Sequence, residues 1–172
     1  MRIMGIDGSL SCTGVAVVED NEVLYMDGIA SNNKDDLKDR IYLLQQTIKE
    51  LIDKYKPQVI VIEDVFMYMN SKTVIDLARL NGALLALCSK LGVKVILYPP
   101  STHKKASTGD GRATKDFTIR KVEEYFNITV PYLLTAKGNI KKKNNEELKN
   151  DNIADALSLC CCYLKMSEVI HE

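Results

Sequence analysis

The sequence predicts an α/β fold in which a mixed five-stranded sheet is flanked by helices. Three short apolar segments precede the first long amphipathic segment, and a turn signal joins two of them. Two further apolar runs then alternate with segments of helical periodicity, as strand–helix–strand units do. The chain of 172 residues is long enough for one full core and short for two, so we expect a single domain over residues 1–172.

Three strands are expected at the start of the chain, over residues 2–8, 13–19 and 22–30. The Glu-Asp-Asn triplet at 19–21 is a turn signal, so the second and third strands should form an antiparallel hairpin. The first strand is largely apolar but carries a carboxylate near its end, Asp7, and a carboxylate is expensive to bury unless its charge is compensated. Asp7 is therefore the first candidate for a functional residue.

A long amphipathic helix is expected over residues 31–57, because apolar residues recur there at steps of three and four. Ser31 or Asn32 is the expected N-cap, and Pro57 should end the helix. Residues 58–64 then form a nearly continuous apolar run, which is typical of a strand buried on both faces.

A second long helix is expected from Ser71 to Leu91. Its apolar residues occupy more than one face, which predicts burial on two sides, by the sheet and by a second partner. Residues 92–100 are expected to form the fifth strand, which completes a sheet of three antiparallel strands followed by parallel ones.

The last part of the chain is more polar. Residues 101–112 are basic and contain glycine, so we expect a loop with at most one turn of helix. A helix is expected over residues 113–126 and another from about Lys149 to Met166. Residues 127–147 match no periodicity, and the Lys- and Asn-rich stretch at 137–145 predicts a mobile segment.

The formal net charge is zero, but it is unevenly distributed. Residues 101–150 carry 11 Lys or Arg and 6 Asp or Glu, a surplus of +5, whereas residues 1–100 and 151–172 carry −2 and −3. A basic segment in a neutral protein indicates an anionic partner on one face, with a solvated basic loop as the alternative.

The five cysteines, three of them consecutive at 160–162, include no Cys-x-x-Cys pair, so a zinc site is not expected. Reduced, buried thiols are typical of a cytoplasmic protein. No apolar run approaches the ~20 residues that a membrane span needs, and no signal peptide is expected.

Acidic residues mark three points of the predicted fold. Asp7 lies in the first strand, Glu63 ends the fourth, and Asp151 and Asp155 lie one turn apart at the start of the last helix. If the first and fourth strands are neighbours and the last helix packs on their face, these carboxylates converge. Clustered carboxylates repel unless cations lie between them, and all-oxygen ligands suit Mg²⁺ or Mn²⁺. A two-ion site of this kind can hydrolyse a phosphodiester by in-line displacement.

Each acid also has a purely structural interpretation. Asp7 could form a turn, Glu63 could be a charge at a strand edge, and Asp151 could be an N-cap. Because two of the acids end otherwise apolar strands, the set taken together favours a metal site.

Four stretches of the sequence carry a family resemblance by their order and spacing: MGIDGSLSCTGVAVV, IEDVFMYMNSKTVIDLARLNGALLA, GDGRATK and NDNIADALSLC. Over nearly the whole chain they resemble the RuvC family of Holliday-junction resolvases, and I-E-D-V-F followed by Ala-Arg-x-x-Gly is the most specific match. The resemblance implies an RNase H-like fold that works as a homodimer, with two Mg²⁺ or Mn²⁺ ions in each active site.

By position, Asp7, Glu63 and Asp155 fall on three of the family's catalytic, metal-binding acids. The fourth position departs from the pattern, because the family usually has an acid or His three residues before the last Asp and this chain has Asn152. Asp151 could replace the missing acid, and the amide oxygen of Asn152 could also ligate a metal, though more weakly. Both ligand sets remain open at this point.

The resemblance also implies residues that contact DNA. Phe66 falls on the aromatic residue that enters the junction centre in the family, with core packing as the alternative. Lys104 and Lys115 fall on basic residues that flank the cleaved backbone, and either could offset transition-state charge. Lys105 and Arg112 belong to the basic segment that would lie along the junction arms.

Two departures are features of a divergent, phage- or prophage-type member: Gly8, where bacterial members often have Pro, and an insertion at 130–147. Gly8 and Gly14 are expected to keep this edge of the sheet free of side chains, so that a nucleic-acid backbone can come close.

Three other functions fit parts of the pattern. An actin or sugar-kinase relative shares the Asp-Gly-Ser hairpin, but such proteins need two domains around a nucleotide. A non-catalytic protein that binds branched DNA would explain Asn152, and an RNase H-like nuclease acting on forks, flaps or RNA would share the acidic site. The expected function is a structure-specific endonuclease that resolves Holliday junctions and other branched DNA by paired nicking. No membrane partner is expected.

Overall fold

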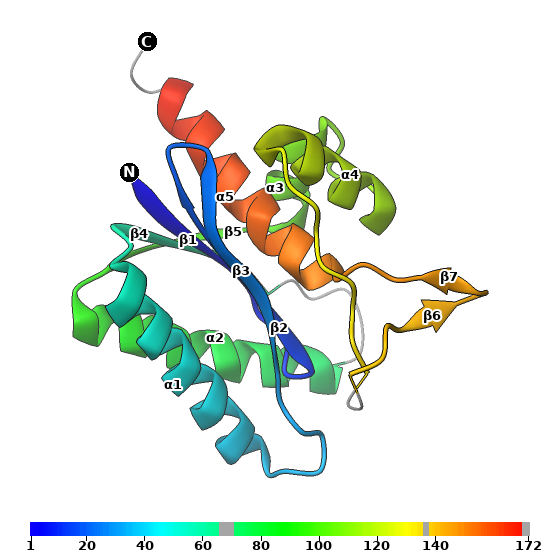
Figure 1. Cartoon of the computed structure of the whole chain (residues 1–172). Coiled ribbons are helices and arrows are strands. Elements are labelled where there is room, and N and C mark those ends of the chain that lie inside the picture. Colours follow the sequence, from blue (N-terminus) through cyan, green and yellow to red (C-terminus); the bar gives the residue numbers. More distant parts are fainter. Residues whose placement is uncertain (66–70, 136–137, 170–172) are drawn as a thin grey trace.

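The computed structural model describes residues 1–65, 71–135 and 138–169. Its centre is a five-stranded sheet of order β3-β2-β1-β4-β5, which lies between two layers of helices (Figure 1). The first three strands are antiparallel, and the last two run parallel to β1. The mixed sheet predicted from the sequence is confirmed. Its strands are β1 (Arg2–Asp7), β2 (Cys12–Glu19), β3 (Glu22–Ala30), β4 (Val59–Glu63) and β5 (Lys94–Tyr98).

Helices cover both faces of the sheet, and strand residues alternate between the two cores. One face is covered by α1 (Leu37–Tyr55) and α2 (Ser71–Leu91), and the other by α3 (Pro100–Thr108), α4 (Lys115–Phe126) and α5 (Asp151–Val169) (Figure 1). The last helix is the centre of its layer because it packs on β1, β2 and β4. The functional acids of the strands therefore need to point toward the α5 face if they are to meet those of α5.

Helix α1 begins later than the sequence predicted, at Leu37, so the expected N-cap at Ser31 or Asn32 is wrong. Ser31 is engaged elsewhere, since its hydroxyl donates to the carbonyl of Leu10 and accepts a hydrogen bond from Arg40 Nε at 2.8 Å. These contacts tie the end of β3 to the β1–β2 connection, a non-local role that the local sequence does not show.

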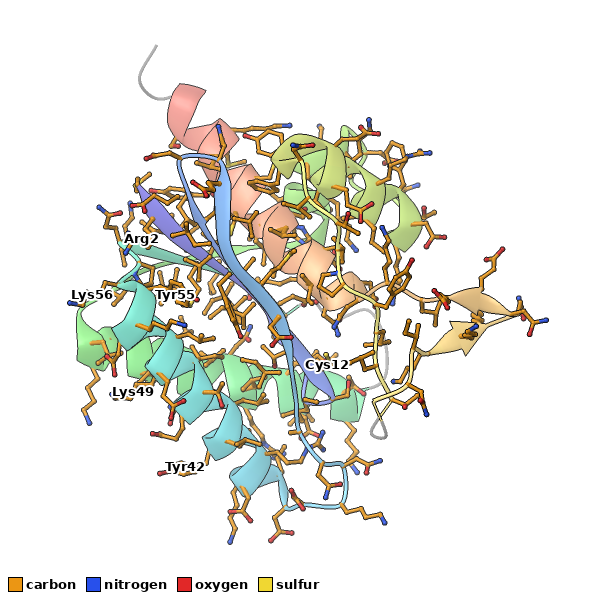
Figure 2. The ribbon with its side chains drawn as sticks, viewed as in Figure 1. Arg2, Cys12, Tyr42, Lys49, Tyr55 and Lys56 are labelled. Carbon is orange, nitrogen blue, oxygen red and sulfur yellow. The ribbon has the colours of Figure 1, made fainter. Side chains whose placement is uncertain are left out.

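The far end of α1 is tied to the sheet by Arg2. Its guanidinium donates to the carbonyl of Tyr55 and, at 2.8 Å, to the carboxylate of Glu19, and Figure 2 shows Arg2 beside the C-terminal end of the helix. Tyr42 and Lys49 point away from the sheet on the outer side of the same helix (Figure 2). Arg2 therefore anchors the N-terminal end of β1, the end away from Asp7.

Residues 101–112 were expected to be mainly a loop, and this expectation is wrong. They contribute to α3, a nine-residue helix that starts with Pro100 and ends before Gly109, which has a left-handed φ of 87°. The residues that α3 buries are polar, His103 and Ser107, so no apolar periodicity marks this helix in the sequence.

Part of the unassigned 127–147 segment forms a hairpin of two short strands, β6 (Lys142–Lys143) and β7 (Glu146–Glu147). Asn144 and Asn145 turn it with φ of 51° and 66°, the left-handed region that Asn tolerates well. The hairpin projects from the body of the molecule near the start of α5 (Figure 1).

Helix α2 is apolar on two faces, as predicted, but only one of them is buried within the chain. Leu80 and Leu84 are fully buried against the sheet, whereas Ile75 and Leu85 are 48% and 36% exposed. Within the described ranges, no helix is both long enough and apolar enough to cross a bilayer. The cysteines are free, and four of the five are buried, as expected.

Candidate functional site

Helix α5 and Asn150 just before it lie close to the sheet because three adjacent strands place glycine beneath them. A Cβ atom built on Gly14 would lie 2.0 Å from the carbonyl oxygen of Asn152, and one on Gly5 would lie 2.1 Å from that of Ala156. Gly28 pairs with Gly14 across β2 and β3 and faces the side chain of Asn150. Gly5, Gly14 and Gly28 together form what we call the glycine line. The expectation that Gly14 leaves room for a nucleic-acid backbone is therefore wrong: the space above it is occupied by the first turn of α5.

This close contact carries two acids of α5 toward the ends of the central strands. Asp7 ends β1, Glu63 ends β4, and the two strands are parallel neighbours, as predicted. Asp7 pairs with Gly14 in β2, so it stands beside the point where α5 touches the sheet. Asp151 and Asp155 come from the first two turns of α5.

The electrostatics of the site show that the four carboxylates influence one another. Burial raises the pKa of Asp7 well above its usual value, and the charges of Glu63, Asp155 and Asp151 raise it further, while Lys104 opposes the shift. Burial also raises the pKa of Asp155, against the attraction of Lys104. Asp7 is only 8% exposed, so its charge needs a partner within the protein or a bound cation.

Two lysines compensate part of this negative charge. Lys115 forms an ion pair with Asp151, and the hydrogen bond between them raises the pKa of Lys115. Lys104 Nζ lies 3.7 Å from Asp155 Oδ2. Both lysines are therefore at the acidic site, where the resemblance implied them.

The donor set fits a hard divalent cation, since it consists of carboxylate oxygens around a buried aspartate. In the part of the chain that the structure describes, no three His, Cys, Asp or Glu side chains are gathered closely enough to ligate one ion together. Asp151 and Asp155 instead face Lys115 and Lys104, and Glu63 lies against His103. Ion binding would require Asp151 and Asp155 to turn from their lysines toward a point shared with Asp7 and Glu63.

Asn152 and Asp151, the two candidates for the fourth ligand, have different surroundings. The Asn152 side chain donates from Nδ2 to the carbonyl of Cys12 at 2.7 Å and so ties the start of α5 to β2. Asp151 faces Lys115 and contributes to the raised pKa of Asp7. The contacts therefore give Asn152 a structural partner and leave Asp151 among the charged groups of the site.

Two polar side chains that the sequence analysis did not single out hold Glu63. Asn81 of α2 donates to its backbone carbonyl at 3.0 Å, and His103 Nε2 lies 2.7 Å from its carboxylate oxygen Oε2. His103 lay in the segment expected to be a loop. Pro100 and Gly109, which bound α3, were the signals that could have located it.

The remaining DNA-contacting candidates are placed as follows. Lys105 and Arg112 are exposed, on α3 and on the connection from α3 to α4. Phe66 lies outside the described residues.

Similarity to known proteins extends over nearly the whole chain. A family model described as crossover junction endodeoxyribonuclease RuvC matches residues 3–163. A relative of that name from Pseudarthrobacter chlorophenolicus is 30% identical over 136 residues, which cover 76% of this chain and 71% of the relative. One from Caldanaerobacter subterraneus subsp. tengcongensis is 29% identical over 176 residues, which cover 100% of this chain and 97% of the relative.

Solved structures agree with this comparison. The structure of Thermus thermophilus RuvC has a TM-score of 0.77 at 20% identity and covers 98% of this chain and 96% of its own. The same protein solved in complex with a Holliday junction substrate has the same TM-score and coverage at 19% identity. At these identities the likeness shows the fold, which confirms the expected RNase H-like architecture.

Proposed function

The chain belongs to the RuvC family of crossover junction endodeoxyribonucleases, and from this premise we propose that it resolves Holliday junctions by metal-dependent paired nicking. The observation that carries the proposal is the position of Asp7. It is a buried carboxylate at the end of a central strand, and three further carboxylates and burial together raise its pKa. A site built this way favours bound cations at neutral pH.

We assign the metal-binding role to Asp7, Glu63 and Asp155, with Asp151 as the fourth ligand. The cofactor is Mg²⁺ or Mn²⁺ because the donors are oxygens, and two ions in each site fit the two-metal mechanism of phosphodiester hydrolysis. When bound, such ions activate the attacking water and stabilise the leaving 3′ oxygen, which produces 5′-phosphate ends.

In this proposal, Lys104 and Lys115 leave their carboxylate partners and bind phosphate. In the structure, Lys104 and Lys115 neutralise Asp155 and Asp151. With cations bound to the carboxylates, Lys104 and Lys115 would be free to contact the phosphate being cut and to offset the charge of its transition state. Lys105 and Arg112 extend this basic surface along the junction arms, and Phe66 would stack on bases at the crossover.

A homodimer would match the two-fold symmetry of an open four-way junction, so that each of two identical sites nicks one strand. The exposed apolar face of α2, with Ile75 and Leu85, supports an interface between two copies. Light scattering is expected to give about twice the 19.3 kDa chain mass, and a monomer both with and without junction would contradict paired nicking.

Cleavage of synthetic DNA tests the proposed function directly. With Mg²⁺ or Mn²⁺, the protein should cut a four-way junction in opposed strands across the branch and leave linear duplex of the same sequence intact. Binding without cleavage would instead indicate a non-catalytic junction-binding protein. Faster cutting of three-way junctions, forks, flaps or RNA would assign the site to a different substrate.

The fourth ligand can be identified with a pair of substitutions. Asp151→Asn should reduce junction cleavage far more than Asn152→Ala, because Asp151 lies among the charged groups and the Asn152 amide is bonded to the backbone of Cys12. Cleavage rates at saturating Mn²⁺ measure the difference. The reverse order would assign the metal to the amide oxygen of Asn152 and leave Asp151 as a helix-terminal acid.

A further inference from the structure

A chain of buried hydrogen bonds ends on Glu63, at the edge of the proposed metal site. His103 has no exposed surface, and its two ring nitrogens lie 2.7 Å from Glu63 Oε2 and 2.8 Å from Ser158 Oγ. Ser158 Oγ in turn lies 2.7 Å from Ser107 Oγ. The chain thus joins β4, α3 and α5 through four polar side chains.

The direction of these hydrogen bonds follows from the groups that must be satisfied. With Glu63 ionised, an unprotonated Nε2 would place two acceptors 2.7 Å apart, so Nε2 carries a hydrogen and donates to Oε2. The Ser158 hydroxyl has one hydrogen and two acceptors in reach, His103 Nδ1 at 2.8 Å and the His103 carbonyl at 3.2 Å, and the Ser107 hydroxyl can donate to Ser158. If Nδ1 also carries a hydrogen, it donates to Ser158, and the donor to Glu63 is unchanged. The bond from His103 to Glu63 therefore does not depend on the charge of the ring.

Simple packing does not account for this arrangement. Both residues that α3 buries, His103 and Ser107, belong to the chain of hydrogen bonds. Apolar side chains of similar volume would fill the same contact with α5 without the cost of desolvating polar groups. Glu63 is the most exposed member, with 23% of its side chain accessible, whereas Ser107 is 8% exposed and His103 and Ser158 have no exposed surface, so the chain opens mainly toward the acidic site.

We propose that His103 is a positioning residue that fixes the orientation of the Glu63 carboxylate for metal binding, with Ser158 holding the ring in place. The inference rests on the proposed function, because it concerns the ligand set of that site. A hydrogen bond to a metal-ligating side chain fixes the orientation of that side chain. Loss of such a bond typically lowers metal affinity or activity ten- to a hundredfold.

Two substitutions of His103 separate orientation from packing. His103→Leu fills the space but removes the donor, so Mn²⁺ affinity should fall about ten- to a hundredfold. The turnover number for junction cleavage should fall as well, with junction affinity unchanged. His103→Gln retains an N–H group near the position of Nε2 and should recover most of both losses. Thr102→Val serves as the matched control: Thr102 lies next to His103 on α3 but is not a member of the chain of hydrogen bonds, so its Mn²⁺ affinity should equal that of the wild type.

Isothermal titration of the DNA-free protein with Mn²⁺ gives the affinities, and thermal unfolding in chelator gives the stabilities. Equal Mn²⁺ affinity in His103→Leu and the wild type would overturn the positioning role. A Gln variant that binds no better than the Leu variant would do the same, since it would show that only ring packing matters. A wild-type protein that neither binds Mn²⁺ nor cuts junctions would instead refute the proposed function, which keeps the two failures distinct.

Discussion

Asp7→Asn is expected to lower the cleavage of a four-way junction by about a thousandfold or more, while junction affinity remains near that of the wild type. The amide keeps the shape of the side chain but removes its negative charge and one ligand oxygen, at the most buried of the four acids. Losses of this size follow the removal of a single group that stabilises transition-state charge. Phosphate contacts dominate affinity for DNA, so binding measured in chelator should persist.

Thermal unfolding shows whether the Asp7→Asn variant is folded. The folded-state pKa of Asp7 lies above that of the unfolded chain, about 3.9. The stability linked to its protonated form is therefore complete below that pH and is lost as pH rises through the folded-state pKa. The variant avoids this loss and, in chelator at neutral pH, should melt above the wild type. Substantial cleavage at saturating Mg²⁺ would refute the catalytic role of Asp7, and a lower melting temperature would refute the electrostatic one.

Gly14→Ala is expected to destabilise the protein by at least about 3 kcal/mol, the upper range for overpacking a core, and to abolish cleavage. The new Cβ would lie 2.0 Å from the carbonyl oxygen and 2.3 Å from the carbonyl carbon of Asn152. Both atoms are backbone, so no side-chain rotation relieves the overlap. Either α5 moves away from the sheet, and carries Asp151 and Asp155 with it, or the protein does not fold.

Gly82→Ala is the matched control for this experiment. Gly82 lies within α2, where a Cβ would have no neighbour within 4 Å, so the substitution should stabilise the protein by roughly 1 kcal/mol through helix propensity. Denaturant unfolding measures both variants. A Gly14→Ala protein as stable as the wild type would show that α5 can shift without cost.

The sequence was most informative where apolar patterns are interrupted by single polar residues. The runs of β1 and β4 identify buried strands, and Asp7 and Glu63 are conspicuous because each is an acid at the end of such a run. Their proximity follows from the parallel pairing of the two strands, which strand–helix–strand connectivity predicts.

Other features could not be predicted because they depend on contacts between distant segments. Helix α3 buries polar residues, so apolar periodicity does not mark it, and His103 gains its partners only when β4 and α5 are in place. Ser31 resembles a helix cap in the local sequence, but its hydroxyl is bonded to Leu10 and Arg40. The prediction that Gly14 leaves room for DNA fails because nothing in the local sequence shows that α5 lies above it.

The contact between α5 and the glycine line also determines how the protein opens. The helix that presents Asp151 and Asp155 also supplies central core residues, such as Ile153 and Leu157, which are almost wholly buried. Detaching its first turns would expose that core, so the free energy of local opening at the acids approaches that of global unfolding. In hydrogen exchange, the first turns of α5 and the core should therefore open together as one cooperative unit, or foldon. The backbone positions of the acids therefore stay fixed as long as the protein remains folded, and the bending needed to bring a scissile phosphate to them falls on the DNA.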